Sequence, residues 1–170
     1  TFHIPSGQTE ANVVVAVSND SIDEEDESVV LTLAKPANAT LGSPTVFALT
    51  ITDNDNPPTV NFSSPGQGGN ENAGGLTASV LMNSVSGKEV VVPYFVTDSE
   101  NSAKSGLDYT LDSGSVTIPA GSLNAVFSIG IVDDTLDELD ETFTIHMGTP
   151  TNATVGSPAN YVVTIADNDQ

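Results

Sequence analysis

The sequence predicts an all-β protein whose antiparallel strands form a two-sheet sandwich. Three observations support this prediction. Apolar and polar residues alternate with a period of two in several short segments, and clusters of Gly, Pro, Asn and Ser separate these segments. The pattern also repeats, because residues 2–55 align without a gap with residues 116–169 and 21 of the 54 aligned positions are identical. No segment has a convincing helical period.

The repeat defines the expected domain organisation. The two aligned segments are offset by 114 positions, which is an ordinary length for one domain. We therefore expect residues 59–170 to form a complete repeat, residues 1–55 to form the second half of another repeat, and residues 56–58 to form a short stiff linker. We expect the half repeat to pack on the complete one, to pair with another chain that completes it, or to be a trimmed remnant of a longer tandem array.

The alternation places the first strands of the complete repeat at residues 59–62, 76–82, 89–97 and 114–118. Two stretches between these strands, Gly66–Gly69 and Ser84–Gly87, have the composition of turns. Three later strands are marked by apolar triplets of one parity: Phe127, Ile129 and Ile131; Phe143, Ile145 and Met147; Tyr161, Val163 and Ile165. About seven short strands in one repeat predict an immunoglobulin-like sandwich.

The half repeat has the same apolar triplets, and it is expected to form three of the same strands. Every position aligned with the later triplets is apolar again: Val13, Val15 and Val17; Val29, Leu31 and Leu33; Phe47, Leu49 and Ile51. Such alternation is typical of strands that bury one face.

The charge of the chain restricts its partners. The sequence has 23 acidic residues against three lysines and no arginine, for a formal net charge of −20. Binding of nucleic acid or of an anionic membrane requires clustered basic residues, so both are disfavoured, whereas polyvalent cations are favoured. No apolar segment reaches the roughly 20 residues of a membrane span, so we expect no membrane insertion. Abundant Thr, Ser, Asn and Gly with scarce Lys favour a secreted bacterial protein with an extracellular or cell-surface location.

Acidic residues concentrate in one expected loop and at one strand end. The segment 133–141 lies between two predicted strands, and Asp167 and Asp169 follow the last strand. Two carboxylates about 4 Å apart repel by about 4 kcal/mol at an effective dielectric near 20, so several converging carboxylates need a cation. Oxygen ligands without His or Cys select Ca²⁺. A solvated acidic loop is the alternative, and the spacing does not fit an EF-hand.

Four segments in order carry a resemblance to a known family. They are Asn70–Gly74, Gly106–Tyr109, the acidic loop Ile131–Phe143 (Ile-Val-Asp-Asp-Thr-Leu-Asp-Glu-Leu-Asp-Glu-Thr-Phe) and Thr164–Asp169 (Thr-Ile-Ala-Asp-Asn-Asp). This combination resembles the Calx-beta domain, which occurs in sodium/calcium exchangers, in integrin beta-4 and in large bacterial surface and adhesion proteins. The resemblance covers the complete repeat and the available half of the other.

The resemblance implies which oxygens bind Ca²⁺, and eight carboxylates imply more than one ion. In the complete repeat the implied ligands are eight acidic positions of the segments above and one backbone carbonyl: Glu71, Asp108, Asp133, Asp134, Glu138, Glu141, Asp167, Asp169 and the carbonyl of Leu136. In the half repeat they are Asp20, Glu24, Glu27, Asp53, Asp55 and the carbonyl of Ile22. The half site is expected to be weaker or empty, since the counterparts of Glu71 and Asp108 would precede residue 1.

Other reactive or modifiable residues are interpreted structurally. We expect His146 to be an exposed strand residue and Tyr109 to fill the core beside the acidic loop. Enzymatic activity is not expected, because a general acid needs an apolar pocket that raises its pKa and few aromatic residues lie near the loop. Three Asn-x-Ser/Thr sequons are present, but two of them recur in the repeated turn motif, where Asn serves turn geometry: Asn38, Asn61 and Asn152.

These observations favour a calcium-stabilised structural module in a tandem extracellular array of a surface or adhesion protein. Its expected partners are calcium ions and neighbouring repeats of the same chain. Two alternatives stay open: an intracellular calcium sensor like the regulatory region of sodium/calcium exchangers, and a calcium-dependent glycan-binding module.

Overall fold

The computed structural model describes residues 1–97 and 102–170, and the chain divides into two compact units. Unit 1 comprises Thr1–Ser21 and Asp26–Thr52, and unit 2 comprises Ile22–Glu25 and Asp53–Gln170. The four residues Ile22–Glu25 therefore belong to the half repeat by sequence and to unit 2 by contacts. Within the described residues, no helix has the length and apolar character needed to cross a membrane.

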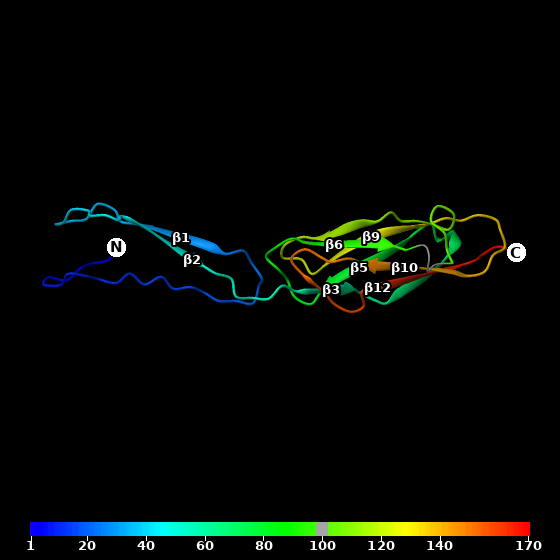
Figure 1. The fold of residues 1–170 in the computed structure, drawn as a ribbon, viewed down its shortest axis with the longest axis horizontal. Helices are drawn as coiled ribbons and strands as arrows, with labels where there is room; N and C mark the ends of the chain where they lie inside the picture. Colours follow the sequence, from blue (N-terminus) through cyan, green and yellow to red (C-terminus); the bar gives the residue numbers. More distant parts are fainter. Residues whose placement is uncertain (98–101) are drawn as a thin grey trace. The chain divides into compact units, whose positions relative to one another are not determined.

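Unit 2 is a sandwich of two five-stranded sheets (Figure 1). One sheet has the strand order β4-β12-β10-β6-β8, and the other has the order β11-β3-β5-β9-β7. The strands are β3 (Thr59–Phe62), β4 (Gly66–Asn70), β5 (Leu76–Met82), β6 (Val90–Val96), β7 (Tyr109–Thr110), β8 (Gly114–Ile118), β9 (Asn124–Ile131), β10 (Glu141–Met147), β11 (Thr154–Val155) and β12 (Asn160–Ala166). The all-β sandwich predicted from the alternation is confirmed.

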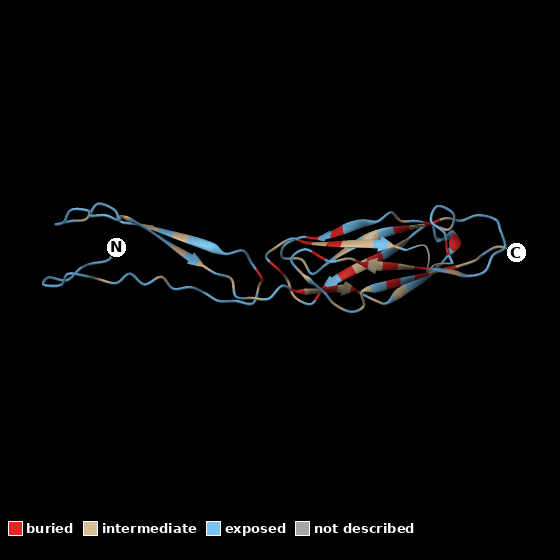
Figure 2. Ribbon diagram, in the orientation of Figure 1, coloured by how far each residue is buried: buried red, intermediate tan, exposed pale blue. Residues whose placement is uncertain are grey.

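The alternation also identifies the side chains that fill the core between the sheets. The seven predicted strands correspond to β3, β5, β6, β8, β9, β10 and β12. Phe143 and Ile145 of β10 and Val163 of β12 are fully buried, as their parity predicts. Figure 2 shows buried segments on strands of both sheets of unit 2. Tyr109 is 1% exposed and stacks on Phe143 with ring centroids 3.8 Å apart, which confirms its interpretation as a core residue.

The prediction of a turn at Gly66–Gly69 is wrong, because these residues form most of β4. This strand pairs in parallel with β12, so the sandwich is not purely antiparallel, and β11 also pairs in parallel with β3. Gly66 is required by the close approach of the two backbones, since a Cβ there would lie 2.2 Å from the carbonyl oxygen of Val162. A strand made largely of glycine has no side chains to alternate, so hydropathy does not reveal it.

Unit 1 contains one antiparallel strand pair, β1 (Glu27–Thr32) and β2 (Val46–Ile51), at two of the three predicted positions. The strand predicted around Val13–Val17 is wrong, since no strand is assigned there. In the complete repeat the aligned strand β9 pairs with β5 and β7, and the alignment places the counterparts of both before residue 1. Alternation without partner strands therefore does not produce a strand, and Val17 is 55% exposed whereas the aligned Ile131 is 7% exposed.

Candidate metal centre

Backbone register brings several of the implied ligands to one end of unit 2. In the parallel pair of β4 and β12, Asn70 lies opposite Ala166. The next residues in the chain, Glu71 and Asp167, therefore leave the sheet at the same end. Strand β10 runs antiparallel to β12, so its first residue, Glu141, also lies at this end. The positions of these acids follow from strand pairing and do not depend on the loops.

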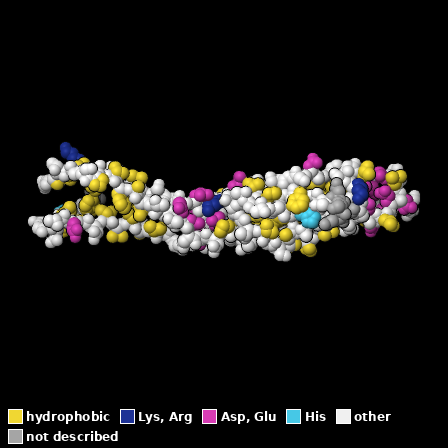
Figure 3. Space-filling view, viewed as in Figure 1, with side chains coloured by type: hydrophobic (Ala, Val, Ile, Leu, Met, Phe, Trp, Pro, Cys, Tyr) yellow, Lys and Arg dark blue, Asp and Glu magenta, His cyan; other side chains and the backbone are white. Residues whose placement is uncertain are grey.

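The second sheet delivers the remaining acids to the same region. Tyr109 of β7 lies opposite Ile131 of β9, and the N–H of Val132 donates to the carbonyl oxygen of Asp108 at 3.0 Å. Asp108 thus adjoins the start of the β9–β10 loop. That loop carries Asp133, Asp134 and Glu138. Figure 3 shows Asp and Glu side chains gathered at the end of unit 2 that carries the C-terminus.

Glu71, Asp167 and Asp169 form a group of three carboxylates that could hold a metal ion. In the part of the chain that the structure describes, one ligand oxygen from each of the three lies within 4.8 Å of the others. Glu71 is 7% exposed and begins the 3-10 helix η1 (Glu71–Ala73). Its Oε1 accepts a hydrogen bond of 3.0 Å from the N–H of Asp134. This bond connects η1 with the β9–β10 loop, so the loop lies against the three-carboxylate group.

Two residues outside the implied ligand set organise this end of unit 2. Asp140 accepts a hydrogen bond of 3.3 Å from the N–H of Asp167. Asn168 accepts a hydrogen bond of 3.2 Å from the N–H of Asn72, and its amide nitrogen lies 3.5 Å from Oδ1 of Asp133. An Asn at position 168 therefore links η1 with the loop and places donor hydrogens among carboxylates, which a third acid there would not do. The repeated Asp-Asn-Asp motif was the only sequence signal for this role.

Desolvation and neighbouring carboxylates raise the pKa of two glutamates in the group. Glu138 is exposed, but desolvation by its surroundings raises its pKa, and the charges of Asp134, Asp108, Glu71 and Asp167 raise it further. The pKa of Glu141 is raised to about 7, first by burial and next by a hydrogen bond with Asp108. Near neutral pH, Glu141 therefore holds a proton for part of the time. A bound cation would displace this proton, because it favours the ionised carboxylate.

One oxygen in the group has no protein partner. Among the described residues, Oδ1 of Asp167 is buried and has no hydrogen-bond donor. A buried carboxylate oxygen without a donor is costly, and coordination to a cation would remove that cost. The surrounding ligands are carboxylate oxygens, which suit hard divalent cations and, for a set this large and irregular, suit Ca²⁺ better than Mg²⁺. The residues present therefore fit a calcium site.

Comparison with known proteins identifies the family. The profile of the Calx-beta domain matches residues 2–55 and again residues 53–169. The chain belongs to the Calx-beta family. It is 31% identical over 150 residues to Adhesion G-protein coupled receptor V1 of Danio rerio, which covers 84% of this chain and 2% of that receptor. It is 27% identical over 163 residues to Sodium/calcium exchanger 1 of Rattus norvegicus, covering 85% of this chain and 17% of the exchanger. The chain thus spans a small part of these curated relatives.

Solved Calx-beta structures have the same fold. The apo-form Calx CBD1 domain has a TM-score of 0.62 and 26% identity, covering 66% of this chain and 98% of that chain. The calcium binding domain CBD12 of CALX1.1 has a TM-score of 0.61 and 26% identity, covering 65% of this chain and 44% of that chain. The family resemblance and the sandwich predicted from the sequence are both confirmed.

The implied ligands of the half Calx-beta repeat are divided between the two units. Asp20 and Glu27 belong to unit 1, and Ile22, Glu24, Asp53 and Asp55 belong to unit 2. Glu27 is the first residue of β1, as its counterpart Glu141 is of β10. In the complete repeat, Leu136 is 60% exposed and its N–H donates to Oδ1 of Asp134 at 2.7 Å. Metal binding by its carbonyl stays a prediction, as does the occupancy of the half site.

The remaining residues singled out from the sequence have structural contacts. His146 faces outward from β10, where its ring stacks on Phe95 and its Nδ1 lies 3.1 Å from Oδ1 of Asn160. The side-chain amide of Asn152 donates to the carbonyl of Glu89 at 2.9 Å, and its φ of 58° is left-handed. Asn38, at the aligned position, has a φ of 57°. Both values agree with the interpretation of the repeated Asn as a turn residue.

Proposed function

We propose that the complete Calx-beta repeat binds Ca²⁺ at the end of unit 2 through the eight carboxylates implied by the family resemblance and the carbonyl of Leu136. The observation that carries this proposal is the buried Oδ1 of Asp167, which has no hydrogen-bond donor among the described residues and belongs to the three-carboxylate group with Glu71 and Asp169. The raised pKa values of Glu138 and Glu141 support it, because desolvation and, next to it, the neighbouring carboxylates both disfavour the ionised glutamates without a cation.

Calcium would act on this protein as a stabilising ligand. When bound it supplies positive charge that neutralises converging carboxylates, while the protein holds their oxygens in place through strand register. A ligand that binds only the folded state stabilises it by RT ln(1 + [L]/Kd), which is about 2.7 kcal/mol at 100 times Kd. The half repeat would bind more weakly, since its aligned set has five carboxylates where the complete repeat has eight. A binding module of this kind needs no catalytic residue.

We further propose that the chain is part of a tandem extracellular array, in which residues 1–55 and 59–170 belong to successive repeats joined by residues 56–58. Two observations support this: the family profile matches the chain twice, and one relative is an adhesion receptor. Millimolar Ca²⁺ would fill sites with Kd values of about 10⁻⁴ to 10⁻³ M, which are typical of extracellular modules. Calcium would then limit unfolding of each repeat and bending between repeats.

An intracellular calcium sensor is the second candidate, because the chain is also similar to a sodium/calcium exchanger. A sensor requires a Kd in the range of about 10⁻⁷ to 10⁻⁵ M. Calorimetric titration of the calcium-free chain would distinguish the two candidates. A Kd in the high micromolar to millimolar range supports the structural array, whereas a Kd near 1 µM or below supports the sensor.

Thermal unfolding with and without a chelator tests calcium binding itself. We expect excess EDTA to lower the Tm of the wild-type chain by several degrees relative to 2 mM CaCl₂, because about 1 kcal/mol corresponds to about 2–8 °C for domains of this size range. The matched control replaces Asp167 by Asn, which should remove most of the difference between the two conditions. Superimposable melting curves of the wild type in calcium and in EDTA would refute the proposal.

A further inference from the structure

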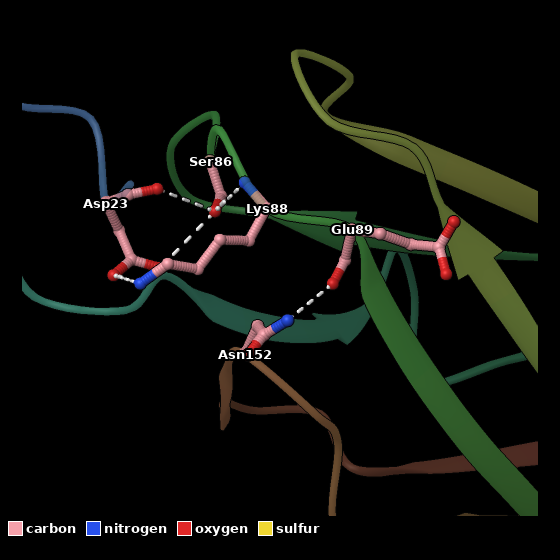
Figure 4. A network of polar contacts seen from close by, with 5 residues as sticks. All are labelled: Asp23, Ser86, Lys88, Glu89 and Asn152. Carbon is pink, nitrogen blue, oxygen red and sulfur yellow. Dashed lines mark hydrogen bonds and ion pairs between the residues drawn. The ribbon is translucent and has the colours of Figure 1, made fainter. Parts of the chain in front are cut away.

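A second polar cluster of unit 2 lies where the segment Ile22–Glu25 meets the turn between β5 and β6 (Figure 4). We call Ile22–Glu25 the docking segment and Ser86–Lys88 the receptor turn. The backbones of the two form a parallel bridge between Asp23 and Ser86, and the N–H of Gly87 donates to the carbonyl of Asp23 at 2.9 Å. The docking segment is thus held by main-chain hydrogen bonds of the type that joins strands.

The carboxylate of Asp23 is bonded through both of its oxygens. Oδ1 forms an ion pair with Nζ of Lys88 at 2.9 Å, and Oδ2 lies 3.3 Å from the hydroxyl of Ser86. Asp23 is 3% exposed, although it is an acidic residue in an acidic stretch. The hydrogen bond from Lys88 to Asp23 raises the pKa of Lys88, so the lysine remains charged. A buried carboxylate needs such partners, and Lys88 is one of only three lysines in a chain without arginine.

The receptor turn is shaped by contacts within unit 2 that do not involve Asp23. Ser86 is fully buried, its hydroxyl accepts from the N–H of Lys88 at 3.0 Å, and its carbonyl accepts from the N–H of Gly121 at 2.8 Å. Gly87 leaves room for the docking segment, since a Cβ at this position would lie 2.8 Å from Cγ of Glu24. The turn therefore presents a small hydroxyl, a backbone N–H and an ammonium group to the docking segment.

The two copies of the acidic loop differ at this residue. Asp23 aligns with Asp137, and Ile22 aligns with Leu136. Asp23 is buried and Ile22 is half-buried, whereas Asp137 is exposed and Leu136 is 60% exposed. Neither Asp23 nor Asp137 belongs to the implied calcium ligands. The aligned Asp is the same in both loops, but only the first loop has a receptor turn downstream of it in this chain.

We propose that the acidic loop of a repeat has a docking role besides metal binding, and that the side chains of Leu136 and Asp137 form a docking surface for a further Calx-beta module, while the carbonyl of Leu136 stays in the proposed calcium site. The partner is defined by its chemistry: a β5–β6 turn with a small hydroxyl residue, a Gly and a Lys, as in Ser86-Gly87-Lys88. Asp23 and Asp137 are the anchoring residues, because each can place one carboxylate against the ammonium group and the hydroxyl. This docking does not require Ca²⁺.

A double-mutant cycle in the full chain tests the role of Asp23. The variants are Asp23→Ala, Lys88→Ala and the double variant, and the readout is amide hydrogen exchange of Gly87 by NMR in excess EDTA. We expect each single substitution to speed exchange at Gly87 by at least 10-fold and the double variant to add little to either. Asp137→Ala is the matched control and should leave Gly87 unchanged. Unchanged exchange in Asp23→Ala, or fully multiplicative effects in the double variant, would overturn the role of Asp23.

The role of Asp137 is tested in a chain extended by a second copy of residues 57–170 after Gln170, which continues the repeat in register. The Gly87 amide of the added copy should be protected to the same extent as that of the original, and Asp137→Ala should remove this protection while Asp23→Ala should not. An unprotected Gly87 in the added copy, or protection that survives Asp137→Ala, would overturn the docking surface. Calorimetric Ca²⁺ titration of Asp23→Ala separates this result from the calcium proposal, since its affinity for the complete repeat should equal that of the wild type.

Discussion

The half repeat and the complete repeat have the same apolar pattern but differ in burial. Phe47 of β2 is 62% exposed, whereas the aligned Tyr161 of β12 is 2% exposed. Both residues lie in antiparallel strand pairs with the same register, because Phe47 faces Leu31 and Tyr161 faces Ile145. The difference is that β12 and β10 lie in a five-stranded sheet that packs on a second sheet. A single strand pair is sufficient to set register, but it is not sufficient to bury a core.

The largest expected effect is a difference in the free energy of unfolding between matched aromatic truncations in the two repeats. Tyr161→Ala should lower the free energy of unfolding of the main transition by about 3–5 kcal/mol, because it removes a buried ring that packs 5.3 Å from Phe62. The matched variant Phe47→Ala should change it by less than about 0.5 kcal/mol. Urea unfolding followed by far-UV circular dichroism measures both. Equal losses in the two variants would show that the half repeat buries Phe47 in solution.

The next effect compares the two acidic sets. Asp167→Asn should weaken Ca²⁺ binding about 10- to 100-fold, or about 1.4–2.7 kcal/mol, because it removes charge from the three-carboxylate group. The aligned variant Asp53→Asn should leave the main Ca²⁺-binding step of a calorimetric titration unchanged. If Asp53→Asn weakened Ca²⁺ binding as strongly as Asp167→Asn, the half repeat would hold a site of similar affinity, contrary to our expectation.

A third comparison uses the repeated Asn. Asn152→Ala should destabilise the protein by about 1–2 kcal/mol, since it removes the hydrogen bond to Glu89 and leaves an alanine at a left-handed φ of 58°. Asn152→Gly should cost less, because glycine adopts this φ without strain. Asn38→Ala, at the aligned position, should have little effect on the main transition. Thermal unfolding of the three variants gives the result, and a Gly variant as unstable as the Ala variant would exclude a contribution from the backbone angle.

The smallest expected effect is a pH dependence of the complete repeat. The folded-state pKa of Glu141 is raised to about 7, so between about pH 4.5 and pH 7 the folded state binds more protons than the unfolded state. The stability of the calcium-free protein should therefore fall as pH rises through this window, by on the order of 1 kcal/mol after solvent screening. Urea unfolding at pH 5 and pH 8 in EDTA measures the slope. Glu141→Gln should reduce it and Glu27→Gln should not, and a stability that rises over this range would contradict the assignment.

The sequence was sufficient to predict those parts of the fold that depend on alternation. The strands around Phe143 and Val163 were found because one face of each meets the opposite sheet. The sequence does not predict strand β4, since its Gly residues have no side chains to form an apolar/polar alternation and its pairing with β12 uses backbone groups. The strand expected near Val15 does not form, because the alignment places the counterparts of its partner strands before residue 1. An apolar/polar alternation forms a strand only when the partner strands of the sheet are present.

The candidate metal centre was accessible from the sequence mainly through its family resemblance. Spacing alone placed Asp133 near Asp134 and Asp167 near Asp169, but it did not bring the two pairs together with Glu71 and Asp108, which depends on strand register. Asp140 and Asp23 were not singled out, although both lie in the repeated acidic motif. Their partners, the N–H of Asp167 and the ammonium group of Lys88, are 27 and 65 residues away in the chain, and no periodicity encodes such pairings.

The stacking of Tyr109 on Phe143 gives this protein an intrinsic optical probe. The chain has no tryptophan and three tyrosines, so its near-ultraviolet signal comes from few rings. Tyr109 directly follows Asp108, and Phe143 lies two positions after Glu141, so this ring pair adjoins two carboxylates that share a hydrogen bond. Each of those carboxylates lies only one or two residues from one of the rings, so we expect their rearrangement to change the surroundings of the ring pair. Tyrosine dichroism can therefore follow events at the acidic end of the sandwich without an added label.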